Sequence, residues 1–118
     1  MFVTLVRLTM HTPHCQSRKD RRSVVRKIKD RVGAKLKVVI AEVGGQETWQ
    51  RIDLGFAVVG PDGGFCDSRA DDVIRMIDEL DLGRRVDLQR ACSNFGEHRD
   101  VDGSQEDWIP DFAKDEMG

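Results

Sequence analysis

The sequence predicts an α+β domain, a two-layer sandwich in which a four-stranded antiparallel sheet carries two helices on one face. Some stretches alternate apolar and polar residues with the period of two typical of strands, and two others repeat apolar residues at helical spacing. Along the chain these stretches follow the order β-α-β-β-α-β. The length of 118 residues suffices for one domain with a hydrophobic core.

The first strand is expected over residues 2–11 and the first helix between Ser17 and Gly33. Apolar residues at alternate positions predict the strand: Phe2, Val6, Leu8 and Met10. Pro13 ends it. Ser17 is a suitable N-cap, and Gly33 is a plausible stop. The helix carries an apolar stripe made of Val24, Val25, Ile28 and Val32.

Residues 36–43 are rich in Val and Ile and predict a second strand, and residues 49–59 predict a third. The core face of the third strand holds Ile52, Leu54, Phe56 and Val58. Turn residues at 60–64 precede a second helix over 68–82, and a last strand is expected over 85–92. The apolar stripe of this second helix is Val73, Ile74, Ile77 and Leu80. This order is the split β-α-β pattern of the ferredoxin-like fold.

In that fold one face of the sheet stays open. The open face is expected to carry residues of the first and third strands: Val3, Leu5, Arg7, Thr9, His11, Trp49, Arg51, Asp53, Ala57 and Val59. Trp49 and Arg51 are candidates for stacking on unstacked RNA bases and pairing with them. Because this face offers a single aromatic residue, packing on another subunit or on the C-terminal tail is the favoured alternative.

Charge is distributed unevenly along the chain. The formal net charge is −2, but residues 1–92 hold 17 Lys and Arg against 13 Asp and Glu, whereas residues 93–118 hold 2 against 8. We expect a domain over 1–92 and an acidic, mostly disordered tail over 93–118. Trp108 and Phe112 bound a short apolar segment of this tail, which could dock on the domain or be incidental, and the acidic charge could compete with a polyanion for the first helix.

The cysteines and the hydropathy indicate the compartment. Cys15, Cys66 and Cys92 are odd in number and form no C-x-x-C pair, which favours reduced thiols. No apolar run approaches the roughly 20 residues of a membrane-spanning helix. A soluble cytoplasmic protein without a membrane partner is therefore expected.

The strongest functional signal is residues 17–31, which place eight cationic side chains against two acidic ones. A helical wheel aligns Arg18, Arg22, Arg26 and Lys29 along one flank of the apolar stripe, and Lys19 could join them. Such a flank predicts salt-dependent contact with RNA phosphates. The alternative is an ordinary solvated face. Arg21 points toward the apolar arc, where its stem can be buried.

The other groups of polar residues in the sequence do not indicate a reaction. His11, His14 and Cys15 match no standard metal site. Glu42 and Asp53 could form a carboxylate pair, although pairing with Arg7 or Arg51 is the simpler account. The glycines at 60–64 lack the Lys-Ser/Thr of a phosphate loop. With no nucleophile beside an evident base, we expect no catalytic residue, cofactor or metal, and a binding module rather than an enzyme.

Residues 1–92 resemble the YlxP-like family of small bacterial proteins, domain-of-unknown-function family 503. The resemblance rests on four places in order: Leu-Thr-Met-His-Thr-Pro at 8–13, Ser-Arg-Lys-Asp-Arg-Arg at 17–22, Ala-Glu-Val at 41–43, and Trp-Gln-Arg with Leu-Gly at 49–55. Arg18 replaces the usual Leu, and the acidic tail lies outside the family pattern. The resemblance implies a ferredoxin-like domain in the bacterial cytoplasm, of undefined activity, commonly encoded beside translation-initiation and ribosome-maturation genes.

The leading hypothesis is a small cytoplasmic protein that binds RNA or a ribosomal particle. Its candidate contacts are Arg18, Lys19, Arg22, Arg26, Lys29, Trp49 and Arg51. The alternative is a homo-oligomer, such as a homodimer, in which open sheet faces pack together without nucleic acid.

Overall fold

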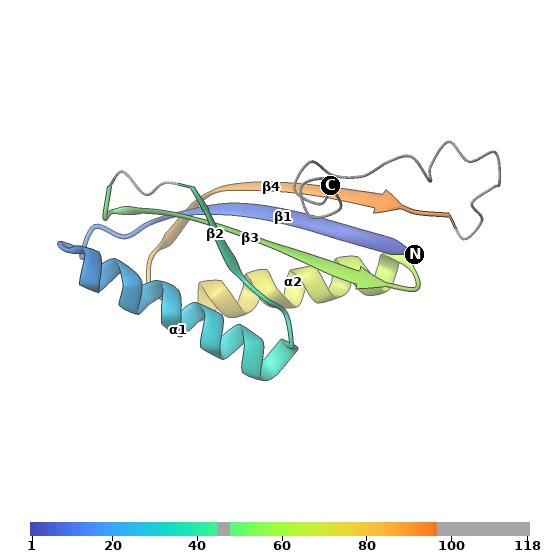
Figure 1. Ribbon diagram of the computed structural model, residues 1–118, viewed down its shortest axis with the longest axis horizontal. Coiled ribbons are helices and arrows are strands. Elements are labelled where there is room, and N and C mark those ends of the chain that lie inside the picture. The colour runs from blue at the N-terminus through green and yellow to red at the C-terminus, as the bar shows by residue number, and fades with distance from the viewer. Residues whose placement is uncertain (45–47, 97–118) are drawn as a thin grey trace, which may run out of the picture.

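The computed structural model describes residues 1–44 and 48–96, and its elements follow the predicted order (Figure 1). The elements are β1 (Phe2–His11), α1 (Arg18–Leu36), β2 (Ala41–Gly44), β3 (Arg51–Gly60), α2 (Gly63–Glu79) and β4 (Arg84–Asn94). All three strand pairings are antiparallel, and the sheet order is β2-β3-β1-β4. Both helices lie on one side of the sheet. The predicted ferredoxin-like fold is confirmed.

Side-chain caps determine where both helices begin. Ser17 is the N-cap of α1, as predicted, and its Oγ accepts a hydrogen bond from the Asp20 backbone N–H at 3.1 Å. At α2 the carboxylate of Asp62 accepts from the Phe65 N–H at 2.7 Å, so the helix begins at Gly63. The expected start at 68 was therefore too late, because a strong cap outweighs the low helix propensity of two glycines in the first turn.

The end of α1 lies beyond the predicted stop at Gly33. The helix continues to Leu36, and Lys37 closes it in the left-handed conformation, with φ 59° and its N–H donating to the Gly33 carbonyl at 3.2 Å. Residues 36–43 are consequently not one strand, and β2 begins only at Ala41. Val38 and Ile40 are nonetheless buried, while Val39 between them is exposed.

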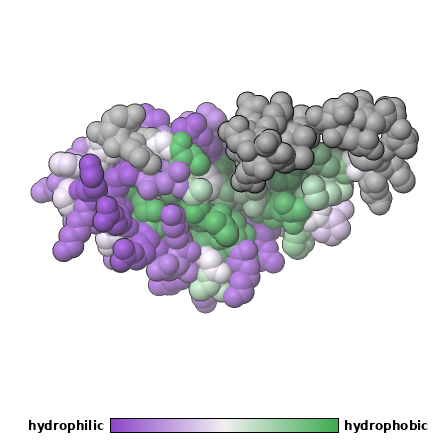
Figure 2. Space-filling model, viewed as in Figure 1, coloured by the Kyte–Doolittle hydropathy of each residue, from purple (hydrophilic) through white to green (hydrophobic). Residues whose placement is uncertain are grey.

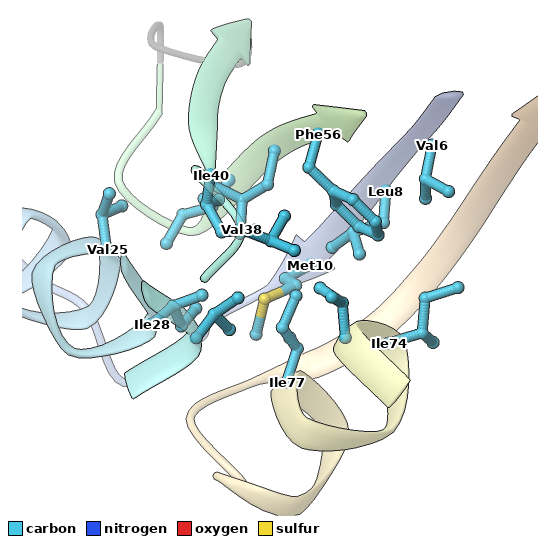
Figure 3. Packing of buried hydrophobic residues seen from close by; sticks show 14 of the residues in the cluster. Val6, Leu8, Met10, Val25, Ile28, Val38, Ile40, Phe56, Ile74 and Ile77 are labelled. Atoms are coloured by element: carbon cyan, nitrogen blue, oxygen red, sulfur yellow. The ribbon is translucent and has the colours of Figure 1, made fainter. Parts of the chain in front are cut away.

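The core fills the layer between the helices and the sheet (Figure 3). Leu8, Met10, Ile52 and Leu54 are almost completely buried, and Leu8 faces Leu54 across the β1–β3 ladder. Ile28 of α1 and Ile77 of α2 point into the same layer. The predicted inward faces of β1, β3 and both helices are confirmed. Leu80 is partly buried and packs at the edge of the core.

Strand β4 ends at Asn94, two residues beyond the boundary expected at 92, and is the outer strand beside β1. After it, Phe95 and Met1 exchange two backbone hydrogen bonds of 2.7 and 2.9 Å. The acidic segment with Trp108 and Phe112 lies outside the described residues. In the portion that the structure describes, neither helix is both long and apolar enough to cross a membrane.

Candidate nucleic-acid interface

A cleft lies beside α1, between this helix, β2 and the turn before β3. Its volume is about 510 Å³, and we call it the basic cleft. The described residues that line it are Arg18, Arg21, Arg22, Val25, Arg26, Lys29, Asp30, Glu42 and Trp49. Figure 2 shows hydrophilic residues gathered on the α1 side of the molecule, next to a hydrophobic region.

Four cations on α1 form the basic row, which consists of Arg18, Arg22, Arg26 and Lys29. Their spacing places them within a narrow arc of the helix, roughly 6 Å apart where they are four residues apart and about 16 Å from first to last. All four side chains are exposed. The alignment predicted from the helical wheel is therefore present, and all four residues line one cleft.

Five arginines elsewhere in the described residues have aspartate partners of a kind that the basic row lacks. Arg7, Arg51, Arg75, Arg85 and Arg90 each form an ion pair with an aspartate. Within residues 1–44 and 48–96, none of the four side chains of the basic row makes an ion pair. No carboxylate in these ranges neutralises their charge through an ion pair, so the charge remains available to an anionic ligand.

Arg21 and Glu42 form an ion pair on the inner side of the cleft. Arg21 is 8% exposed and also donates from Nη2 to the Arg51 carbonyl at 3.4 Å. Burial of its stem was expected from the helical wheel, but the pairing with Glu42 was not. Because Glu42 is already paired, its charge opposes a bound anion less than a free carboxylate would.

Trp49 is not on the open sheet face, where the sequence pattern placed it. Strand β3 begins at Arg51, and Trp49 belongs to the preceding turn and lines the basic cleft. The alternation of β3 therefore does not extend back to this residue. Trp49 is 45% exposed. Sequence periodicity placed Trp49 on the wrong surface because it assumed a continuous strand. In a turn, side chains no longer alternate between the two faces of the sheet.

The remaining predicted contacts lie elsewhere. Lys19 is exposed on α1 but is absent from the described lining of the cleft. Arg51 lies on the open sheet face, where it lines a separate hollow with Thr9, His11 and Val86. The structure thus gathers five of the seven predicted contacts in the basic cleft and leaves Lys19 and Arg51 outside it.

Asp53 lies on the open face and is nevertheless only 1% exposed. Thr9 Oγ1 donates to its carboxylate at 2.8 Å, Arg7 Nη2 at 3.1 Å and Arg51 Nε at 3.3 Å. Burial alone raises the pKa of this carboxyl, but hydrogen bonds from Thr9, Arg51 and Arg7 outweigh burial and hold the pKa below its usual range. The expected pairing with Arg7 or Arg51 is confirmed for Asp53 but is wrong for Glu42, which pairs with Arg21.

Glu42 and Asp53 do not form a carboxylate pair. Glu42 pairs in register with Leu54 and contacts α1 through Arg21, whereas Asp53 is held by Arg7 on the open face. The metal hypothesis gains no support either. The described ranges contain no group of three or more His, Cys, Asp or Glu residues that could hold a metal ion. His11 and His14 are exposed, and Cys15 is fully buried.

The open face also carries an apolar hollow of about 690 Å³. Among the described residues that line it are Leu5, Val39, Ala41, Val43, Ala57 and Ala91. Leu5 pairs in register with Ala57 on one side and Ala91 on the other, so a large side chain stands between two small ones. Leu5 is 50% exposed and Val43 is 46% exposed.

Fold and surfaces together define a small ferredoxin-like α+β domain with a basic cleft on its helix side and an apolar hollow on its open face. The chain belongs to the family described as "Protein of unknown function (DUF503)", which matches residues 3–90. The YlxP-like resemblance is thereby confirmed.

One curated relative resembles the chain in sequence, and the solved structures resemble it in fold alone. The chain is 46% identical over 43 residues to the "Uncharacterized protein YlxP" of Bacillus subtilis (strain 168), a match that covers 36% of this chain and 47% of that protein, about half of its length. Among solved structures, protein YJCS is similar with TM-score 0.50 and 8% identity over 80% of this chain and 99% of that one. A dimeric protein of unknown function and ferredoxin-like fold from Bacteroides fragilis NCTC 9343 has TM-score 0.44 and 10% identity, over 80% and 96%.

Proposed function

We propose that this protein is a cytoplasmic RNA-binding module, acting on RNA or a ribosomal particle through the basic cleft, and that it is not a catalyst. The observation that carries the proposal is the basic row. Four exposed cations line one cleft, and none of them pairs with a carboxylate in the described part of the chain. RNA phosphates supply the counter-charge that these side chains lack.

The proposal makes a quantitative statement about salt. If each cation of the row contacts one phosphate, the logarithm of the association constant falls with the logarithm of salt concentration with a slope of about −2.8 for a single strand. Loss of one contact reduces the slope by about 0.7. A solvated helix face without a ligand role gives no such dependence on particular residues.

The experiment compares two charge reversals on α1. The first variant combines Arg22→Glu, Arg26→Glu and Lys29→Glu, all in the cleft. The second combines Lys27→Glu, Arg31→Glu and Lys35→Glu, three exposed residues of the same helix that are not among the described lining of the cleft. Both change the net charge equally. Fluorescence anisotropy with labelled RNA and co-sedimentation with ribosomes, both at low salt, provide the measurements.

We expect the cleft variant to lose binding and the matched control to lose much less, with circular dichroism showing that both variants fold. Equal losses would mean that only net charge matters and would remove the cleft from the proposal. Absence of RNA or ribosome binding by the unaltered protein at low salt would overturn the proposed function altogether.

A second candidate function is favoured by the apolar hollow of the open face. Two copies placed face to face could insert Leu5 of each into the small-residue surface around Ala57 and Ala91 of the other. Such an isologous contact is the usual geometry of a homodimer. Light scattering at tens of micromolar tests it: a monomer at this concentration rejects the dimer, and a dimer that Leu5→Lys dissociates supports it.

A further inference from the structure

Trp49 is a large aromatic residue that the fold leaves 45% exposed at the basic cleft. Exposure of one apolar side chain is common and carries little meaning alone. The position of this one is more informative, because the same cleft holds all four cations of the basic row. An aromatic surface beside a row of cations is the combination that binds single-stranded nucleic acid.

The backbone under Trp49 is held by residues of the β1–α1 connection. Thr12 Oγ1 donates to the Trp49 carbonyl at 3.2 Å, and the Thr12 N–H donates to the Gln50 carbonyl at 2.8 Å. Gln50 Nε2 in turn donates to the Cys15 carbonyl at 3.2 Å. Thr12 and Cys15 are both fully buried. The turn is therefore tied to the interior while the indole stays accessible, so the aromatic surface is positioned before a ligand arrives.

We infer, on the basis of the proposed function, that the basic cleft binds a single-stranded stretch of RNA, with phosphates on the basic row and one base stacked on Trp49. The row extends for about 16 Å, enough for several phosphates of a short strand. Val25 adds an apolar surface within the cleft. The Arg21–Glu42 pair lines its inner side without adding net charge.

Duplex RNA can satisfy only half of this arrangement. Its phosphates can contact the basic row, but its bases are paired and stacked on one another and offer no free face to an indole. Single-stranded RNA gains the stacking contribution in addition to the phosphate contacts. The cleft should therefore prefer single-stranded to duplex RNA, and that preference should depend on Trp49.

The first experiment measures binding of labelled oligouridine and of an oligoadenosine–oligouridine duplex of equal length by anisotropy. We expect Trp49→Ala to weaken oligouridine binding by at least about fivefold and to leave duplex binding unchanged. Trp49→Phe keeps an aromatic face and should retain most of the preference. It also serves as the control for any effect of the substitution on folding.

The second experiment observes Trp49 directly. The chain has two tryptophans, and Trp108→Phe leaves Trp49 as the single one. Stacking of a base on the indole should quench its fluorescence when oligouridine is added, and the duplex should leave the emission unchanged. This readout does not depend on the stability of a Trp49 variant.

The outcomes separate the two proposals. Equal affinity for single strand and duplex, unaffected by Trp49→Ala and without quenching, overturns the inference and leaves the cationic cleft as a general RNA site. Failure of both RNA forms to bind overturns the proposed function and the inference with it. A preference for the single strand that Trp49→Ala abolishes supports both.

Discussion

Glu42 on β2 and Arg21 on α1 form an ion pair that joins the sheet edge to the basic helix and lines the inner side of the cleft. Arg21 is 8% exposed, so its guanidinium has given up most of its hydration. The carboxylate compensates for this loss. Glu42 thus stabilises the buried guanidinium and offsets the positive charge that Arg21 would otherwise present to the cleft.

Replacing Glu42 by Gln should have two opposite effects. We expect the free energy of unfolding to fall by about 1–3 kcal/mol, since a largely buried hydrogen bond to a charged group is weakened. We expect RNA affinity at low salt to rise, because a negative charge leaves the cleft. Urea denaturation and anisotropy measure the two quantities. Asp30→Asn is the control, as Asp30 lines the same cleft but is exposed and should affect stability little.

Asp53 should make stability depend on pH. Its pKa is lowered in the folded state, because hydrogen bonds from Thr9, Arg51 and Arg7 outweigh the upward effect of burial. Its contribution is therefore fully present above the unfolded pKa of about 3.9 and is lost as the pH falls through the lower folded value. Asp53→Asn should cost about 1–3 kcal/mol at pH 7 and progressively less in acid. A cost that stays constant from neutral to acidic pH would contradict this account.

Gly33 should be replaceable by alanine with a gain in stability. It lies inside α1, and a Cβ built there meets nothing within 4 Å. Gly33→Ala should stabilise the protein by about 0.5–1 kcal/mol, measured by urea denaturation. Gly83→Ala is the contrasting change. Its Cβ would lie 2.6 Å from Thr12 Cγ2 and 3.0 Å from the His11 carbonyl oxygen, so we expect a loss of about 1–3 kcal/mol.

The three thiols should react at different rates. Cys92 is exposed, whereas Cys15 and Cys66 are buried. Burial raises the pKa of the Cys66 thiol, and the nearby Cys92, Asp62 and Asp67 add to the effect. In the native protein a colourimetric disulfide reagent should modify one thiol rapidly. Cys92→Ser should remove that rapid phase; if it persists in the variant, the assignment is wrong.

Much of the fold could be predicted because its signals are local. The alternation of Leu8 and Met10 in β1 and the spacing of Ile28 and Val32 in α1 placed these residues in the core, where the structure has them. Element boundaries were less predictable. Gly33 did not end α1, because its neighbours continue the helix and Lys37 can adopt the left-handed closing conformation itself.

Some features of the candidate site could also be predicted from the sequence, and others could not. The basic row could be predicted because all its members belong to one helix, and a helix has a known period. The partner of Arg21 could not, since Glu42 reaches it from another element. For the same reason periodicity did not indicate that Asp53 would be buried under Arg7 and Arg51.

By itself, the sequence determined the order of the elements, the inward faces of β1, β3, α1 and α2, and the alignment of four cations on α1. These follow from covalent spacing along one element. Only the tertiary structure decided that Trp49 joins those cations and that Arg51 does not. The physical reason is that the turn before β3 is held by Thr12 of another segment, and such a contact across the chain directs a side chain independently of the strand's own period.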